Sequence, residues 1–136
     1  FIETVLREVY EEGDVLIVVE DAEPWFECDH AIMEGMGKLI EGKHYNYFKL
    51  PPKHYPTYQF KKPEWSKAVS LFTLMSCFGW KCFLYGSDSH LTLYNWEGDV
   101  YDFWTDSPIK KKAMNQILRN FGAKRIQRRA RKQTAK

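Results

Sequence analysis

The sequence predicts an α+β fold, with helices packed on a mixed sheet of four or five strands whose last three strands form an antiparallel meander. Apolar residues recur at helical spacing in four segments, and β-branched or aromatic runs mark five strands. Along the chain these elements alternate until three strands follow one another before a last helix, an order typical of an α+β protein. The chain of 136 residues has the length of one ordinary domain. We expect a single domain over residues 1–121 and a basic extension over residues 122–136.

The first half of the chain predicts two helices and two strands. Residues 1–12 place apolar side chains at helical spacing, and Gly13 ends the pattern; the inward positions are Phe1, Val5, Leu6 and Val9. Residues 14–20 enclose five consecutive apolar residues between acids, which indicates a central strand covered on both faces. A helix over 29–41 and a strand over 44–49 are expected to follow.

The second half predicts the main core helix, the meander and a last helix. Pro63 fits the first position of a helix that extends to Gly79; its inward positions are Trp65, Ala68, Val69, Phe72, Leu74 and Met75. Residues 82–105 contain three short strands separated by two turn-forming segments. Ser107 and Pro108 are suited to begin the last helix, whose expected apolar stripe is Ile109, Ala113, Ile117, Leu118 and Phe121.

Charge is strongly segregated along the chain. Residues 1–30 carry ten acids and one Arg, residues 31–108 carry eight charges of each sign, and residues 109–136 carry eleven Lys or Arg and no acid. The formal net charge of +2 is therefore a near-cancellation of an acidic head and a basic tail. Each block is able to attract a partner of the opposite sign.

The basic tail is the strongest functional signal, because clustered cations bind nucleic-acid backbones by releasing condensed counterions. The sequence thus predicts a small non-enzymatic protein that binds nucleic acid or a nucleoprotein, with these contacts: Lys110, Lys111, Lys112, Arg119, Lys124, Arg125, Arg128, Arg129, Arg131 and Lys132. An acid-free segment over 42–62 interleaves rings and cations and is expected to add a stacking platform, with Lys43, Lys53, Lys61, Lys62, Tyr55 and Tyr58. Three alternatives stay open for the tail: a nuclear-localisation or anionic-membrane patch, a solvated helix end whose cations complement the macrodipole, and docking on the acidic head of the same molecule.

The acidic head supports a different hypothesis, an immunity or inhibitor-type module that neutralises a basic partner such as a nuclease toxin. The residues expected to contact that partner are Glu8, Glu11, Glu12, Glu20, Asp21, Glu23, Glu27 and Asp29. The simpler alternative is that acids at a first helix complement its dipole.

Metal and catalytic motifs are weak. The three cysteines and four histidines form no paired spacing of a zinc site, and Cys77 and Cys82 are expected to be core thiols. Pairs such as Asp88 with His90 lack the glycine loop or nucleophile elbow that would accompany them. We therefore expect no cofactor and no metal. The absence of a disulfide framework and of a long apolar stretch favours a reducing compartment, the cytoplasm, or the nucleus of a eukaryotic or virus-infected cell.

Aromatic residues make up 16% of the chain, more than one small core requires. We expect some of these rings to lie at the surface, where an amphipathic aromatic side chain contributes to recognition.

Overall fold

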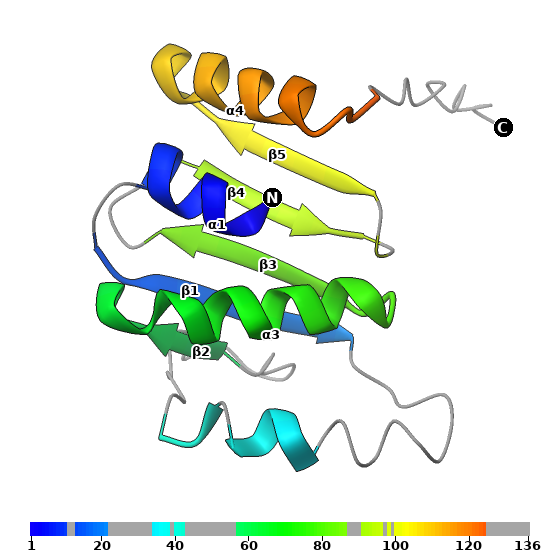
Figure 1. Cartoon of the computed structure of the whole chain (residues 1–136). Helices are drawn as coiled ribbons and strands as arrows, with labels where there is room; N and C mark the ends of the chain where they lie inside the picture. The colour runs from blue at the N-terminus through cyan, green and yellow to red at the C-terminus, as the bar shows by residue number, and fades with distance from the viewer. Residues whose placement is uncertain are drawn as a thin grey trace, which may run out of the picture.

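The computed structural model describes residues 1–10, 13–21, 34–38, 40–42, 57–86, 91–96, 98 and 100–124. A five-stranded sheet contains β1 (Val15–Asp21), β2 (Thr57–Phe60), β3 (Lys81–Gly86), β4 (Leu91–Asn95) and β5 (Tyr101–Thr105). The helical elements are α1 (Ile2–Val5), the π-helix η1 (Leu6–Tyr10), the 3-10 helix η2 (Lys62–Glu64), α3 (Trp65–Cys77) and α4 (Pro108–Asn120). The α+β class and the C-terminal meander are confirmed (Figure 1).

The sheet has the strand order β2-β1-β3-β4-β5 and is antiparallel at every pairing. The expectation of a mixed sheet was wrong in this detail. β2 and β3, which α3 connects, do run in the same direction, as a β-α-β order suggests. However, β1 lies between them and pairs with both, so the two parallel strands never become neighbours.

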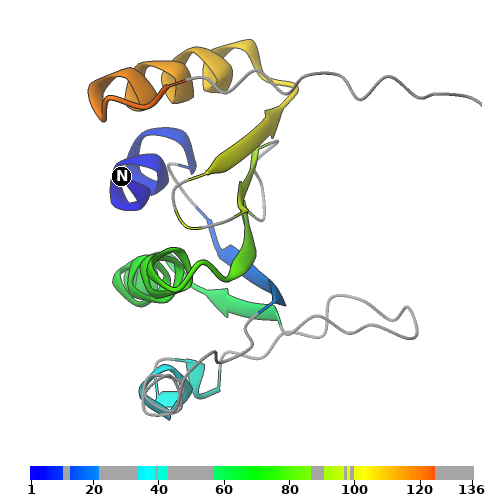
Figure 2. The ribbon, with the colours of Figure 1, turned by 90° about the vertical axis from the view of Figure 1, so that its right-hand side faces the viewer.

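The described helices α1, α3 and α4 lie on one face of the sheet, as Figure 2 shows in blue, green and orange. The core fills the space between these helices and the inward side chains of the strands, including Ile17, Leu84 and Leu93, each 0% exposed. The buried Tyr10 hydroxyl crosses this layer and donates hydrogen bonds to the carbonyl oxygens of Leu84 (2.9 Å) and Leu91 (3.2 Å). Such bonds fix the first helical segment over β3 and β4, because a buried hydroxyl without a partner is costly.

The predicted first helix is present as α1 followed by η1. The expected inward residues Val5, Leu6 and Val9 are buried, and Ile2 and Tyr10 join them. β1 is buried on both sides, as expected: Leu16 and Val18 are 9% and 5% exposed, although they face away from the helices. For residues 1–10 the sequence pattern gives the inward positions Val5, Leu6 and Val9 correctly, but Phe1 is only half-buried and the π-helical turn was not expected.

The main core helix is α3, preceded by η2 with Pro63 in its first turn. Ala68, Phe72 and Met75 are 0% exposed, as predicted, and so is Leu71. Residues 34–38 and 40, within the predicted helix over 29–41, are helical. The predicted strand over 44–49 lies outside the described residues.

In α4 the apolar stripe differs from the predicted one. Met114 and Ile117 are buried, but Ile109 is 81% exposed and Phe121 53% exposed. At 100° per residue, Ile109 lies about 110° from the centre of the face defined by Met114 and Ile117, so it projects away from the core. Among the described residues no helix has the length and apolar character needed to cross a membrane.

Candidate nucleic-acid interface

The helix α4 positions the described cations of the basic tail. Ser107 is its N-cap, and the Ser107 hydroxyl accepts a hydrogen bond from the Lys110 backbone N–H at 3.3 Å. Packing of Met114 and Ile117 on the core then fixes the rotation of the helix. As a result Lys111, Lys112 and Arg119 are exposed, whereas Lys110 is half-buried.

From Lys111 to Asn120 the exposed residues of α4 are only cations and amides. Lys112 and Arg119 are seven residues apart and therefore lie on the same side of the helix. Two amides hydrogen-bond along the helix: Asn115 to the Lys111 carbonyl oxygen at 2.8 Å, and Gln116 to Asn120 at 2.9 Å. No acid occurs from residue 108 to 136, and none of the ion pairs among described residues includes a cation of α4. This face therefore presents uncompensated positive charge.

The position of three lysines in α4 matters for the alternative interpretation based on the macrodipole. Lys110, Lys111 and Lys112 lie at the amino end of the helix, where the dipole is positive and no acidic residue occupies the first turn. Cations at this end oppose the dipole, at roughly 0.3–1 kcal/mol each. Helix stability thus accounts for Arg119 in the last turn but not for the three lysines.

The predicted stacking platform over residues 42–62 does not adjoin α4 in the described part of the chain. Lys61 and Lys62 are exposed beside the edge strand β2, whereas α4 packs next to β5 at the other edge. Four strand spacings, roughly 19 Å, separate the two edges. The ring of Tyr58 is buried in the core, at 8% exposed, and burial raises its pKa; Lys43, Lys53 and Tyr55 lie outside the described residues.

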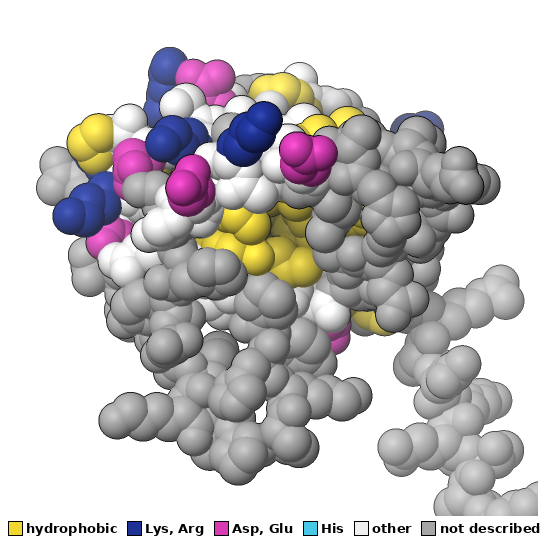
Figure 3. Space-filling model, turned by 90° about the horizontal axis from the view of Figure 1, so that it is seen from below, with side chains coloured by type: hydrophobic (Ala, Val, Ile, Leu, Met, Phe, Trp, Pro, Cys, Tyr) yellow, Lys and Arg dark blue, Asp and Glu magenta, His cyan; other side chains and the backbone are white. Residues whose placement is uncertain are grey.

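Around β2 and η2 the charges are mixed. Lys67 lies 4.0 Å from Glu64, and the Lys62 ammonium is 5.7 Å from the centre of the Trp65 ring. The view from below shows cationic and acidic side chains interspersed (Figure 3). This surface therefore differs from the acid-free face of α4.

The described acids of the head do not form one surface. Glu8 is exposed on η1, in the helix layer, and Glu3 of the same layer pairs with Arg7 at 2.6 Å. Glu20 points to the opposite face of the sheet, where it accepts a hydrogen bond from the Tyr94 hydroxyl at 2.5 Å. The side chains of the other acids named for the inhibitor hypothesis lie outside the described residues.

The sheet face opposite the helices has a feature that the sequence analysis did not locate. Alternation along β3, β4 and β5 brings five aromatic side chains to this face, which we call the open aromatic face: Phe83, Tyr85, Tyr94, Trp96 and Trp104. Trp96 is 36% and Trp104 is 52% exposed. The surplus of aromatic residues predicted exposed rings, but only the pairing of strands brings these five together.

Tyr94 is at the centre of the open aromatic face. Its ring stacks on Phe83 with centroids 4.2 Å apart and contacts Trp96 and Trp104 at 5.9 and 6.4 Å. Burial, the hydrogen bond to Glu20 and the nearby negative charge of Glu20 all raise the pKa of Tyr94. The hydroxyl, whose ordinary pKa near 10 already keeps it protonated at neutral pH, ties the ring cluster to the Glu20 carboxylate.

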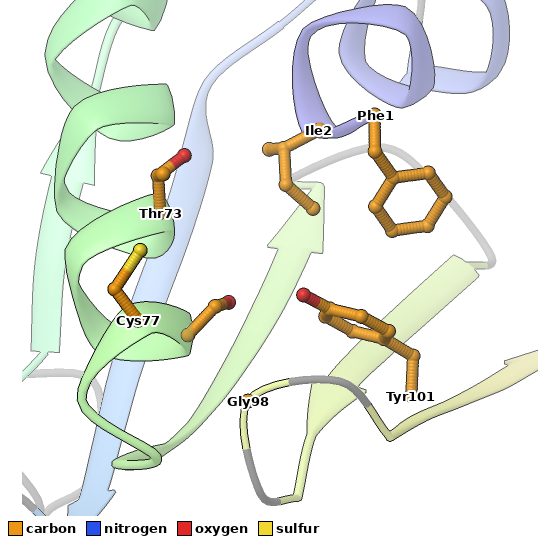
Figure 4. A pocket seen from close by; sticks show the side chains of 7 residues that line it. Phe1, Ile2, Thr73, Cys77, Gly98 and Tyr101 are labelled. Atoms are coloured by element: carbon orange, nitrogen blue, oxygen red, sulfur yellow. The ribbon is translucent and has the colours of Figure 1, made fainter. Parts of the chain in front are cut away.

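A groove of about 500 Å³ opens on the helix side between α1, the end of α3 and the turn after β4 (Figure 4). Its described lining is Phe1, Ile2, Thr73, Ser76, Cys77, Gly98 and Tyr101. Their side chains include no carboxylate, imidazole or cation.

The two described cysteines lie in different environments. Cys82 is 0% exposed in β3, and burial raises the pKa of its thiol, although the nearby Asn95 amide has a smaller lowering effect. Cys77 is exposed at the end of α3, so the expectation that both are core thiols was wrong for Cys77. The helix rotation that buries Met75 turns Cys77, two residues later, outward.

No group of three potential metal ligands occurs among the described residues. All four histidines and Cys28, which carried the weak metal and catalytic motifs, lie outside them.

The fold and its surfaces thus define an α+β protein with a cationic outer helix and an open aromatic sheet face. The chain matches no protein-family model, no curated protein and no solved structure.

Proposed function

We propose that this protein binds nucleic acid or a nucleoprotein, chiefly through phosphate contacts from α4 and the basic residues that follow it. The single observation that carries the proposal is the cluster of cations at the positive end of α4. Charge placed where it lowers helix stability is expected to serve another purpose, and a phosphate is stabilised both by lysines and by a helix amino terminus.

The length of α4 suits a nucleic-acid backbone. Lys111 and Arg119 are eight residues apart, so about 12 Å of helix axis separates them. A nucleic-acid strand rises about 3.4 Å per phosphate along a duplex axis, so the exposed cations of α4 span three or four phosphates. Contacts of this kind position a backbone without reading sequence.

The test measures the binding of a duplex DNA and of a single-stranded RNA as a function of salt concentration. The double variant Lys112→Gln/Arg119→Gln removes two exposed charges from α4. We expect it to lower the slope of log K against log salt by about 1.8 for the duplex, because each phosphate contact contributes about 0.9.

The matched control is Lys38→Gln/Lys67→Gln, which removes two charges from exposed residues outside α4. It changes the net charge equally, and we expect its slope to remain close to that of the unmodified protein. Equal slope changes in both variants, or no binding at low salt, would contradict the proposal. The further variant Lys61→Gln/Lys62→Gln measures whether the edge near β2 contributes.

A further inference from the structure

Among the described residues, the open aromatic face brings together five rings from β3, from β4 with the residue that follows it, and from β5. Trp96 and Trp104 form its exposed margin, while Tyr94 is 8% exposed at its centre. Phe83 and Tyr85 extend the contacts across β3, with ring centroids 5.7 Å apart. None of the described helices lies over this face (Figure 2). Clustered rings at a surface are typical of a recognition site.

Carboxylates accompany these rings. Glu20 holds the Tyr94 hydroxyl. Asp102 pairs with Tyr94 across the strands and lies two residues from Trp104 on β5, so the two share a face. Negative charge on Asp102 contributes to the raised pKa of Tyr94, so this charge lies within electrostatic reach of the ring cluster. Lys81, on β3, is the one described cation with its side chain directed to this side of β3–β5.

We infer that the open aromatic face binds an arginine-rich segment of a partner protein. A guanidinium group stacks on a tryptophan ring and simultaneously donates paired hydrogen bonds to a carboxylate. Trp104 and Asp102, two residues apart on one face of an edge strand, offer both partners to a single arginine. Glu20, which accepts the hydrogen bond of the Tyr94 hydroxyl, adds a second carboxylate to this face.

Charge distinguishes this occupant from others that rings attract. Bases of single-stranded nucleic acid also stack on aromatic side chains, but their phosphates would lie near the carboxylates of Glu20 and Asp102. A second copy of the chain docked face to face would bring the same carboxylates together and create like-charge repulsion. An arginine-rich segment is attracted by both the rings and the acids.

The test uses the full chain and a fluorescent peptide of nine arginines, with binding measured by anisotropy. A nine-glutamate peptide and a single-stranded RNA serve as competing probes. We expect Trp104→Ala and the isosteric Asp102→Asn each to weaken peptide binding about tenfold. Ile109→Ala is the matched control, because it removes an exposed apolar side chain from α4, and it should leave the affinity unchanged.

The inference is independent of the proposed role of α4. Lys112→Gln/Arg119→Gln is expected to leave peptide binding unweakened, so either proposal is able to fail alone. No peptide binding, equal binding by Trp104→Ala, or RNA binding that depends on Trp104 would overturn the inference. A gain in peptide affinity on replacing Arg125, Arg128, Arg129 and Arg131 by Gln would identify the chain's own tail as the occupant and would also overturn the partner assignment.

Discussion

Replacement of Gly98 by Ala tests how the turn after β4 is held against α3. Gly98 has φ +76°, and a Cβ atom at this position would lie 2.7 Å from the Ser76 backbone oxygen. That oxygen already accepts a hydrogen bond from the Gly79 N–H at 3.2 Å, at the end of α3. Two costs are therefore expected: a left-handed backbone for a residue with a Cβ, and a displacement of the α3 terminus.

The magnitude follows from these two costs. The left-handed conformation costs about 1 kcal/mol for Ala relative to Gly. The contact requires a shift of about 0.5 Å against backbone, which costs about 1–2 kcal/mol by comparison with overpacked sites. We expect Gly98→Ala to lose about 2–3 kcal/mol of unfolding free energy. With an unfolding entropy near 2.1 cal/mol/K per residue, this loss lowers Tm by about 7–10 °C.

Gly122 provides the matched control. It has φ +69°, but nothing lies within 4 Å of the position of its Cβ. Gly122→Ala should therefore lose only the conformational term, about 1 kcal/mol or 3–4 °C. Both variants are measured by thermal and urea unfolding. Equal losses would refute the steric part of the argument, and no loss in Gly98→Ala would refute both parts.

Two further predictions concern Tyr10 and the two described cysteines. Tyr10→Phe removes the hydroxyl that bonds to Leu84 and Leu91, and urea unfolding at pH 7 should show a loss of about 1–2 kcal/mol. Burial raises the pKa of Tyr10. The stability that this residue contributes is therefore fully present below the unfolded pKa near 10 and is lost as pH rises above that value. Tyr10→Phe should weaken this alkaline loss of stability, and an unchanged dependence of the unfolding free energy on pH would contradict the assignment. In a Cys28→Ser background, a thiol reagent should modify the exposed Cys77 quickly and the buried Cys82 only on unfolding. Comparable rates for the two thiols in the folded protein would be inconsistent with their placement.

Local patterns predicted most of the described elements. The inward residues of α3, the N-cap of α4 and the three strands of the meander all depend on interactions within a few residues, so the sequence shows them directly. The predictions were wrong where contacts between residues distant in the sequence determine which side chains are buried. Ile109 fits an apolar stripe by spacing, yet the core contacts of Met114 and Ile117 set the rotation of α4 and leave Ile109 exposed.

The candidate cationic surface was also predictable in part. The cations of α4 are visible in the sequence, and so is their position after Ser107 and Pro108. The distance between these cations and Lys61 and Lys62 was not predictable, because it depends on β2 and β5 forming opposite edges of the sheet. Strand order depends on pairing between segments that are far apart in the sequence, and the local sequence pattern does not specify that pairing.

The sequence by itself determined the α+β class, the charge segregation and a surplus of aromatic residues. Only the tertiary structure decided that β1 lies between β2 and β3, that every described helix covers the same face, and that rings from three strands meet on the other. The physical reason is visible in β4 and the residue after it, where Leu91 and Leu93 point into the core and Tyr94 and Trp96 point to the other face. Such a strand is apolar on both faces, so its period of two separates the two sets of side chains without showing which set the helices cover.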